Sequence, residues 1–579
     1  IYHFAPYEPT ALKRLMGRFA TREVELDRLL RGQAFVDLYR VVKHALLAGV
    51  ERYSIKDLEP FFGYARQQDL RDASASRRIV EHAIEAGDMD ETFDEHRRVV
   101  EDYNREDCES AQRLRDWLEH LRAGVIGKGH KLPRPAAQDD EASEKISELD
   151  RELQRLRDGL LDGVPLNPEE RSAEHQARFI LAHMMEFHRR EAKAGWWEYF
   201  RVRELEESDY ADERRAVIGL TFREVLDPKP APLQRYQFPT QELDVRRGDD
   251  ISFDNNKRLG GVTDINYSER TIDIKKSKAT ADTHPTAVVF HSRVNAEPLQ
   301  RSLMRLGEAV LACGLAAPSP YKSAIELLLR RSSPLVDEHG VLQQQNETTV
   351  EAACRLAVGL DEHVLAIQGP PGTGKTFTGG QMICELKRRG LKVGVTAVSH
   401  KVIVNLLETA LEAAEKQGVD LRAVHRQSGE YEGKWGIERK TAYPAIRSQL
   451  EDGSIDVLGA TPWCWARPEF EQSVDVLIVD EAGQMTLSNV LAASPAGTGL
   501  ILLGDPQQLE QPLQSSHPEG SEASALYHLL DGADTMPPDK GLFLGETWRL
   551  HPDIARFTSE IYYEGKVTAR PELVHQAIV

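Results

Sequence analysis

The sequence has 579 residues, is 41% hydrophobic and 29% charged, and carries a net charge of −20, which indicates a folded chain of several domains. No apolar run approaches a membrane span, and the acidic total argues against a surface covered by nucleic acid, although a local basic groove stays possible. The five cysteines form no CxxC pair, so we expect neither a disulfide framework nor a zinc site, and we place the protein in the cytoplasm.

Residues 1–122 mix short apolar stretches with charged helical runs and are predicted to form one domain. YHFAPYEPTAL places Glu8 after a strand-like start, and YNREDCES places Tyr103 and Asp107 four residues apart on one helix face. Carboxylates brought together from separate elements can hold two Mg²⁺ or Mn²⁺ ions for phosphodiester hydrolysis. A helical Tyr–Asp pair is by itself usually a solvated or capping feature, so the spacing alone does not decide.

Residues 123–340 begin with the polar linker GVIGKGHKLPRPAAQDD and combine helices with a small β module. Apolar residues at alternating steps of three and four form the seam of a long helix: Ile146, Leu149, Leu153, Leu156 and Leu160. We favour packing of this seam within one chain over a coiled-coil dimer. The segments ELDV and GGVTDINYSERTIDIKK predict strands, with a hairpin that turns at 266–269.

Two groups of residues in this region admit a binding and a structural interpretation. Lys275, Lys276 and Lys278 lie at the end of a predicted strand, where they could contact phosphates or form a solvated basic strand end. Trp196 and Trp197 could stack on bases, although tryptophans beside a long helix more often belong to a core.

Residues 341–535 alternate apolar strands with helices, the pattern of a parallel sheet covered on both faces. GPPGTGKT follows a predicted strand, opens a predicted helix and fits GxxxxGK[ST], a phosphate-binding loop. Its glycines let backbone N–H groups point at the β-phosphate, Lys375 reaches the β and γ oxygens, and the Thr376 hydroxyl binds Mg²⁺. The predicted nucleotide-binding residues are Gly369, Pro370, Pro371, Gly372, Thr373, Gly374, Lys375 and Thr376.

The segment VDVLIVDEAGQ predicts a buried strand that ends in Asp480 and Glu481, at the edge where parallel sheets bind ligands. Asp480 can hold Mg²⁺, and Glu481 can orient and deprotonate the attacking water. Gln484 of the same motif is assigned to the nucleotide. In LLGDPQQL, Gln508 could lie beside the γ-phosphate.

The order GPPGTGKT, TAVSHKVIVNLL, DEAGQ, GDPQQL, TWRLHPDIARF resembles the superfamily 1 helicases of the Upf and Dna-two type, over about 364–567. The resemblance implies that Thr396, Ser399 and Thr461 contact a single strand and that Arg549 approaches the γ-phosphate. It also implies a RecA-like lobe over 341–535 and the start of a second lobe over 536–579. ATP follows from the resemblance, because no adenine-reading glutamine stands out and no NKxD-like guanine reader is present.

The N-terminal residues resemble the RNase H-like 3′→5′ exonucleases. Glu8 falls at the acid of their second motif, and Tyr103 with Asp107 falls at the third. Asp37 fits the middle of that family, whose first two acids would precede Ile1. Together with the motor, the chain resembles the bacterial fused RecB-like nuclease–helicases, and we expect it to be an internal piece of a longer protein.

These patterns predict an α/β multidomain fold: a truncated RNase H-like domain, a helical stalk with a small β-barrel, and a RecA-like parallel sheet. The expected function is an ATP- and Mg²⁺-dependent helicase or translocase on single-stranded DNA or RNA, fused to a Mg²⁺- or Mn²⁺-dependent nuclease for DNA processing or repair. An RNA or ribonucleoprotein remodelling ATPase, and a binding scaffold with a degenerate nuclease domain, are the alternatives. No membrane association is expected, and the sequence identifies no protein partner.

Overall fold

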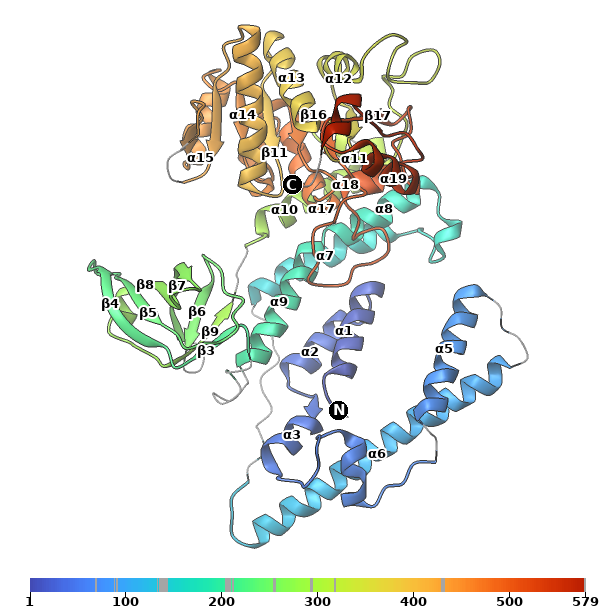
Figure 1. The fold of residues 1–579 in the computed structure, drawn as a ribbon, viewed down its shortest axis with the longest axis vertical. Coiled ribbons are helices and arrows are strands. Elements are labelled where there is room, and N and C mark those ends of the chain that lie inside the picture. Colours follow the sequence, from blue (N-terminus) through green and yellow to red (C-terminus); the bar gives the residue numbers. More distant parts are fainter. Residues whose placement is uncertain are drawn as a thin grey trace. The chain divides into compact units, whose positions relative to one another are not determined.

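The computed structural model describes residues 1–67, 70–87, 89, 92–132, 134, 144–203, 210, 213–253, 257–291, 295–316, 319–428 and 433–576. The chain divides into two compact units, Ile1–Ser143 and Glu144–Val579 (Figure 1). Within the described residues, no helix combines the length and the apolarity that a membrane span requires.

The first unit is mainly helical around one short parallel strand pair. Its strands are β1 (Tyr2–His3) and β2 (Val36–Asp37), and its helices are α1 (Tyr7–Phe19), α2 (Glu23–Arg31), α3 (Leu38–Ala45), α4 (Ile55–Leu58), α5 (Leu70–Ala86) and α6 (Phe93–Gly127). Asp37 fixes the end of β2, because its Oδ1 accepts bonds of 2.9 Å from the N–H groups of Tyr39 and Ala5. The helix α6 continues past residue 122, where the sequence predicted a boundary.

The second unit is built on an eight-stranded parallel sheet in the order β13-β12-β14-β11-β15-β16-β10-β17. The strands are β10 (Val364–Gln368), β11 (Val393–Thr396), β12 (Ala423–Arg426), β13 (Glu438–Lys440), β14 (Val457–Gly459), β15 (Val474–Val479), β16 (Gly497–Gly504) and β17 (Gly541–Phe543). Successive side chains of a strand point to opposite faces. Accordingly Val364 and Ala366 enter one hydrophobic core, and Leu365 and Ile367 enter the other.

Helices cover both faces of this sheet, as predicted (Figure 1). One face carries α12 (Thr349–Val358), α13 (Lys375–Arg388) and α14 (His400–Gln417). The opposite core includes α7 (Glu144–Leu161), α8 (Ala173–Met184), α10 (Glu297–Cys313), α11 (Lys322–Leu329), α16 (Pro462–Trp465), α17 (Leu487–Ala493) and α18 (Ala525–Leu530). Leu153, Leu156 and Leu160 are at most 1% exposed, so the leucine seam of α7 packs within this unit. The stalk helices thus share a core with the sheet.

A second, antiparallel sheet has seven strands in the order β3-β9-β6-β7-β8-β5-β4. Its strands are β3 (Ala216–Ile218), β4 (Thr221–Asp227), β5 (Leu233–Gln237), β6 (Asp250–Phe253), β7 (Lys257–Asn266), β8 (Thr271–Lys276) and β9 (Ala287–His291). Only residues 219–220 separate the two edge strands β3 and β4, so the sheet curls back on itself like a barrel. Among the described residues no ladder closes it. The predicted hairpin is confirmed, since Asn266 pairs with Thr271.

The structure differs from the sequence expectations at two places. The first is β17, placed by sequence in a second lobe: it pairs with β10 at the edge of the eight-stranded sheet. Gly541 permits this approach, because a Cβ there would lie 2.4 Å from the Ala366 carbonyl oxygen. Beyond it come a short parallel pair, β18 (Glu546–Thr547) and β19 (Thr568–Ala569), and α19 (Pro552–Tyr562).

The second difference concerns the lysines at the end of β8. Lys276 is buried: its ammonium group donates to the Thr283 carbonyl and lies 5.0 Å from the Tyr236 ring centroid. It therefore supports the curled sheet and does not offer its charge to a phosphate, whereas Lys275 and Lys278 are exposed. Trp196 and Trp197 belong to α9 (Phe187–Arg203), but their side chains lie outside the described part of the chain.

Candidate functional site

The candidate site lies along the carboxyl edge of the eight-stranded sheet. Because all the strands are parallel, the segments that follow them meet at one edge, which is where such sheets bind ligands. Three of these segments contain the predicted nucleotide-site motifs: 369–376 after β10, 480–484 after β15, and 505–508 after β16.

The loop between β10 and α13 has the backbone of a phosphate-binding loop. Gly372 and Gly374 have φ of +78° and +87°, a region that suits glycine, and no side chain caps the first turn of α13. The N–H groups of that turn can therefore bind an anion. Lys375 is 9% exposed, and its Nζ donates to the Gly369 carbonyl at 2.7 Å. Thr376 lies in the same turn and is half-buried.

Two carboxylates follow β15. Asp480 is 2% exposed, and burial, reinforced by the Glu481 carboxylate, raises the pKa of Asp480 to about 7, while Lys375 opposes the shift. Glu481 has a φ of +53°, and its Oε2 is buried without a hydrogen-bond partner in the described part of the chain. Hard oxygen donors are the ligands that Mg²⁺ takes, and Asp480 and Thr376 supply them, so the residues fit this ion.

The loop after β16 packs directly on the DEAGQ segment. A Cβ on Gly483 would lie 2.2 Å from the Asp505 carbonyl oxygen, so only glycine permits this contact. The Asp505 Oδ2 accepts a bond of 3.1 Å from Gln508 Nε2 and one of 2.8 Å from the Tyr563 hydroxyl. Gln484 lies half-buried beside this contact. Sequence reasoning missed Asp505 and Tyr563; the first stood in a quoted motif, whereas nothing in the sequence marked the second.

The segment that carries Arg549 is bonded to the phosphate-binding loop. Thr547 Oγ1 donates to the Pro371 carbonyl at 3.0 Å, and the Trp548 N–H donates to the Gly372 carbonyl at 2.8 Å. A Cβ on Gly372 would lie 2.4 Å from the Arg549 Cβ. Arg549 itself is exposed. Its backbone is thus held against the loop, with the guanidinium group able to turn toward a bound phosphate.

Two of the three residues predicted to contact a single-stranded nucleic acid lie at the accessible carboxyl edge of the sheet. Ser399 caps α14 by accepting from the Val402 N–H, and Thr461 precedes α16; both are half-buried. Thr396 differs from the expectation, because it is fully buried between neighbouring strands. Its carbonyl accepts from the Asp480 N–H at 2.8 Å, so it connects β11 to the DEAGQ segment.

The predicted nuclease residues of the first unit are not gathered around a metal position. Glu8 is exposed on α1, and its Oε2 lies 3.9 Å from Nδ1 of His3. Tyr103 and Asp107 do share one face of α6, but the Arg66 guanidinium lies 2.5 Å from Asp107 and the Lys56 ammonium donates to the Tyr103 hydroxyl at 2.6 Å. Among the residues described, no three His, Cys, Asp or Glu side chains could together hold a metal ion. A divalent metal therefore does not fit these residues as they stand.

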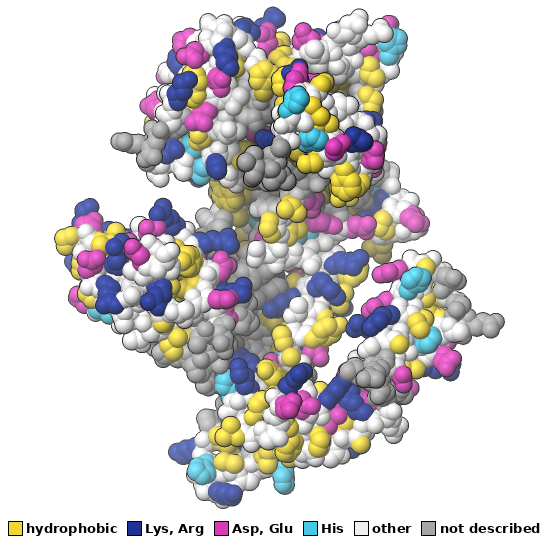
Figure 2. All heavy atoms as spheres, in the orientation of Figure 1, with side chains coloured by type: hydrophobic (Ala, Val, Ile, Leu, Met, Phe, Trp, Pro, Cys, Tyr) yellow, Lys and Arg dark blue, Asp and Glu magenta, His cyan; other side chains and the backbone are white. Residues whose placement is uncertain are grey.

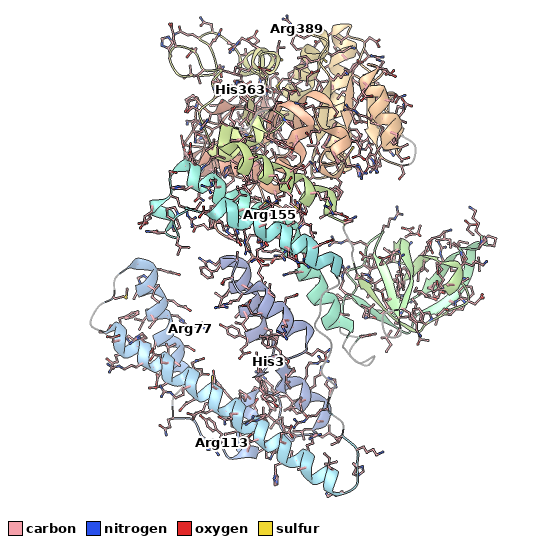
Figure 3. The ribbon with its side chains drawn as sticks, turned by 180° about the vertical axis from the view of Figure 1, so that it is seen from behind. His3, Arg77, Arg113, Arg155, His363 and Arg389 are labelled. Atoms are coloured by element: carbon pink, nitrogen blue, oxygen red, sulfur yellow. The ribbon has the colours of Figure 1, made fainter. Side chains whose placement is uncertain are left out.

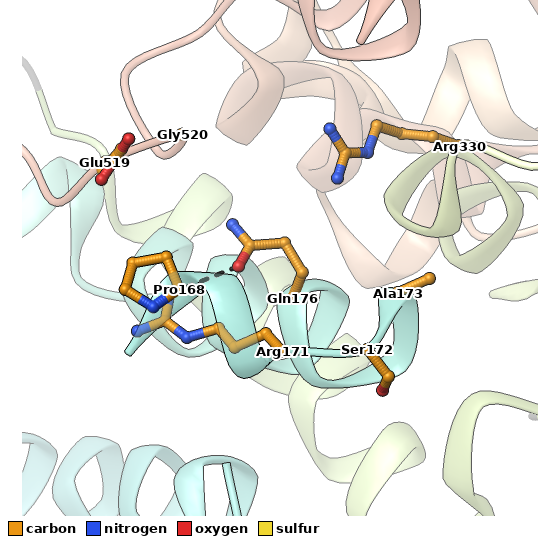
Figure 4. A pocket seen from close by; sticks show the side chains of 8 residues that line it. All are labelled: Pro168, Arg171, Ser172, Ala173, Gln176, Arg330, Glu519 and Gly520. Carbon is orange, nitrogen blue, oxygen red and sulfur yellow. Dashed lines mark hydrogen bonds between the residues drawn. The ribbon is translucent and has the colours of Figure 1, made fainter. Parts of the chain in front are cut away.

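A separate cavity of about 470 Å³ contains none of the predicted site residues (Figure 4). It is lined by Pro168, Arg171, Ser172, Ala173, Gln176, Arg330, Glu519 and Gly520. Arg171 donates to Gln176, and Arg330 pairs with Asp531. Both arginines are thus already engaged, and we assign this cavity no ligand.

Comparisons with known proteins match two different parts of the chain to two families. A family profile described as AAA domain matches residues 335–517, and one described as RNase_H superfamily matches residues 1–119. The DNA-binding protein SMUBP-2 of Rattus norvegicus is 26% identical over 328 residues, which cover 46% of this chain and 32% of that protein. The DNA replication ATP-dependent helicase/nuclease dna2 of Schizosaccharomyces pombe is 26% identical over 254 residues, 42% of this chain and 17% of that protein.

A second relative from Schizosaccharomyces pombe, the DNA polymerase alpha-associated DNA helicase A, is 22% identical over 369 residues, 54% of each chain. Among solved structures, the arterivirus nonstructural protein 10 (helicase) with DNA is 15% identical with a TM-score of 0.24, covering 38% of this chain and 44% of that one. The chain spans about a third of SMUBP-2 and less of dna2. The family profiles and the sequence relatives confirm the predicted similarity to helicases and to the RNase H superfamily.

Proposed function

We propose that this chain is the motor-bearing part of an ATP-dependent helicase or translocase that acts on single-stranded nucleic acid, with DNA as the substrate, in the cytoplasm. The observation that carries the proposal is the bonding of the 547–549 segment to Pro371 and Gly372. It unites Arg549 with the phosphate-binding loop, while the DEAGQ and GDPQQL segments meet at the same sheet edge. A phosphate loop, a carboxylate pair, a glutamine and an arginine are the parts that triphosphate hydrolysis needs.

On nucleotide binding, Lys375 exchanges its bond to the Gly369 carbonyl for the β and γ oxygens, and the N–H groups of the first turn of α13 donate to the phosphates. Thr376 and Asp480 would hold Mg²⁺, which supplies positive charge to the β and γ oxygens when bound. Burial, reinforced by the Glu481 carboxylate, raises the pKa of Asp480 to about 7, and a cation held there would favour the charged form of Asp480.

Glu481 is the proposed base: its carboxylate takes a proton from water while the water oxygen bonds to the γ-phosphorus. The bond between that phosphorus and the β–γ bridging oxygen breaks, so ADP leaves with the electron pair. Gln508, oriented by Asp505, lies on the adjacent loop to position the water, and Arg549 offers positive charge to the γ-phosphoryl oxygens. In comparable enzymes such an arginine contributes roughly 10³–10⁵ in rate.

The nucleic-acid contacts are proposed at Ser399 and Thr461, which lie at the accessible edge of the sheet after β11 and β14. The backbone carbonyl of Thr396 accepts from the Asp480 N–H. This bond connects the edge that would bind the nucleic acid to the residue that would hold Mg²⁺ with the nucleotide. DNA is proposed because one relative is named as a DNA helicase, one as a DNA replication ATP-dependent helicase/nuclease and one as a DNA-binding protein. An RNA-remodelling ATPase would use the same residues.

The test is steady-state ATP hydrolysis by the chain, with and without single-stranded DNA or RNA of equal length. Lys375→Ala should abolish triphosphate binding, whereas Lys416→Ala, which removes an exposed lysine on α14, should not change it. Greater stimulation by RNA would favour the remodelling alternative. A wild-type chain that binds neither ATP nor a strand would overturn the proposal.

A second function is proposed for the first unit, as the nuclease-type module of a nuclease–helicase that acts in DNA processing or repair. The match of residues 1–119 to the RNase_H superfamily supports it. These residues do not form a cleavage site as they stand, because Arg66 pairs with Asp107 and no three described acids or other metal-ligating side chains converge. Degradation of end-labelled DNA with Mg²⁺ or Mn²⁺, lost in Asp107→Asn, would support cleavage. DNA binding without cleavage would instead support the scaffold alternative.

A further inference from the structure

A group of basic and aromatic side chains lies at the carboxyl ends of β12 and β13, outside every motif that the sequence analysis used. Arg426 ends β12, and the sheet order places β12 beside β14, which is itself beside β11. Since neighbouring strands are about 4.8 Å apart, Arg426 lies about 10 Å along the edge from the end of β11. The same edge carries Ser399 and Thr461, so the group lies in line with the proposed strand contacts.

Arg426 and Arg467 share one aromatic ring. Their guanidinium carbons lie 4.4 Å and 4.3 Å from the Tyr443 ring centroid. Tyr443 begins α15 (Tyr443–Glu451), and its ring packs edge-on against the buried Phe470. The ring therefore holds two like charges near each other on a fixed support, and all three side chains remain partly accessible.

The surroundings of this group are cationic. The imidazoles of His400 and His425 lie 3.0 Å apart between Nδ1 and Nε2. Burial, then the charges of Arg426 and Arg439, lowers the pKa of His400. Burial, then His400 and Arg439, lowers the pKa of His425 to about 4. Burial is thus the main cause of both shifts, and neighbouring positive charge acts in the same direction.

Few counter-charges lie near this group in the part of the chain that the structure describes. Arg467 pairs with Glu469 at 3.1 Å, but within the described residues no carboxylate lies within ion-pair distance of Arg426. The Arg426 Nε is buried without a hydrogen-bond partner there, and so is Nδ1 of the fully buried His425. A desolvated guanidinium donor without an acceptor is unfavourable, and a phosphate oxygen would satisfy it. Figure 2 shows basic and acidic side chains interspersed on the visible surface, so such a gathering is local.

We infer that Arg426, Arg467 and Tyr443 form an additional subsite for a phosphodiester of the bound strand, beyond Ser399 and Thr461. The inference rests on the proposed nucleic-acid-binding function and extends it to the outer strands of the sheet. The two guanidinium groups bind the non-bridging phosphate oxygens, and the Tyr443 ring keeps both in place. The subsite reads no base sequence, because it contacts the backbone.

The experiment measures affinity of the full chain for fluorescein-labelled oligothymidylate over a series of salt concentrations. Arg426→Gln should weaken binding roughly three- to tenfold and lower the slope of log K against log salt by about 0.7, the value for one phosphate of a single strand. Arg467→Gln should act in the same direction, and Arg426→Lys should restore most of the slope but not the full affinity. Thermal unfolding of each variant checks that it is folded.

The matched control is Arg389→Gln. Arg389 follows α13 at the opposite edge of the same sheet (Figure 3), so its loss changes the net charge equally and should leave strand affinity unchanged. If Arg389→Gln and Arg426→Gln lose equal affinity for oligothymidylate, the loss comes from the change in net charge, and the subsite is refuted. Ser399→Ala and Thr461→Ala distinguish the proposed nucleic-acid-binding function from the proposed subsite. If they weaken binding while Arg426→Gln does not, the subsite is refuted and the function stands.

Two more outcomes have definite meanings. A wild-type chain without affinity for oligothymidylate overturns the proposed function and this subsite together. Inorganic pyrophosphate identifies a small-anion site: if Arg426→Gln weakens pyrophosphate binding and leaves oligothymidylate binding unchanged, the strand subsite is refuted. The loss should also be larger for long than for short oligonucleotides, because a short strand can bind at Ser399 and Thr461 alone.

Discussion

The Tyr563 hydroxyl donates a 2.8 Å hydrogen bond to Oδ2 of Asp505, the same oxygen that accepts from Gln508. Through this bond the end of α19 is attached to the loop that carries a proposed water-positioning residue. Asp505 is buried, so its carboxylate depends on these donors in place of solvent. The proposed γ-phosphate contact is therefore supported from a segment more than fifty residues later in the chain.

Tyr563→Phe should destabilise the protein by about 1–3 kcal/mol, because it leaves a buried carboxylate oxygen short of one donor. It should also slow ATP hydrolysis, because Asp505 then holds Gln508 less firmly. Urea unfolding and hydrolysis rates measure the two effects. Tyr562→Phe is the control, since the neighbouring ring is exposed. Equal behaviour of the two variants would show that the bond to Asp505 contributes nothing.

Lys375→Ala and Glu481→Gln should separate binding from turnover. The first removes the main point charge on the phosphates, so triphosphate affinity should be lost. The second keeps the shape of the side chain but removes the base, so affinity should persist while hydrolysis stops. Nucleotide affinity and hydrolysis are measured separately. Wild-type turnover by Glu481→Gln would refute its assignment as the base.

Gly372→Ala should weaken nucleotide binding in addition to the loss of stability that a positive φ causes for alanine. Its φ of +78° disfavours alanine, and the added Cβ would lie 2.4 Å from the Arg549 Cβ and 2.8 Å from Thr547 Oγ1. We expect displacement of the 547–549 segment, with weaker nucleotide binding and slower hydrolysis. Gly418→Ala is the control: φ there is +64°, with open space around the new Cβ, so it should cost about 1 kcal/mol of stability and leave nucleotide affinity unchanged. Similar nucleotide affinities of the two variants would show that the contact between Gly372 and the 547–549 segment does not affect nucleotide binding.

Glu191→Gln should loosen the loop that follows the GDPQQL segment. On α9, the Glu191 carboxylate accepts from the N–H groups of Gln514 and Ser515, each at 2.9 Å, and bonds His517 Nε2 at 2.8 Å. Loss of charge-assisted bonds should cost about 1–3 kcal/mol and speed amide exchange at 514–517. Glu412→Gln, at an exposed pair with Lys416, is the control. Unchanged exchange at 514–517 in Glu191→Gln would contradict this attachment.

The sequence predicted the parallel sheet and the order of the motifs that follow its strands, because local pattern determines both. Apolar strands followed by Gly-rich or acidic turns leave a clear signal, and their parallel pairing brings the motifs to one edge. Contacts between distant segments left no such signal: nothing in the sequence marks Tyr563 as a partner of Asp505. Burial was equally invisible for some polar side chains: Lys276 stands in the polar run KKSK and Thr396 at the end of an apolar strand, and both lie inside the fold. A three-residue strand such as β17 is too short for a periodic pattern and is recognised only by its pairing with β10.

His528 should make the stability of the second unit depend on pH. It is buried, and burial, reinforced by Arg330, lowers the pKa of His528 to about 4, while the Leu328 carbonyl, 3.3 Å from Nε2, opposes the shift. The unfolded chain protonates this ring near pH 6.5, so between about pH 6.5 and 4 the unfolded state binds more protons. The free energy of unfolding should therefore fall as the pH drops through that window, by about 1.4 kcal/mol per pH unit for this residue, and should lose no more from it below pH 4.

Urea unfolding at about pH 5 and pH 7 measures this effect. His528→Gln should lower the number of protons taken up on unfolding by about one, which makes the free energy of unfolding less dependent on pH. His339→Gln, at an exposed histidine, should leave this pH dependence unchanged. Other buried histidines, including His188 with its pKa lowered to about 4 by burial, add to the slope in both proteins and so cancel in the difference. If His528→Gln and wild type lose equal stability between the two pH values, His528 does not remain neutral in the folded state.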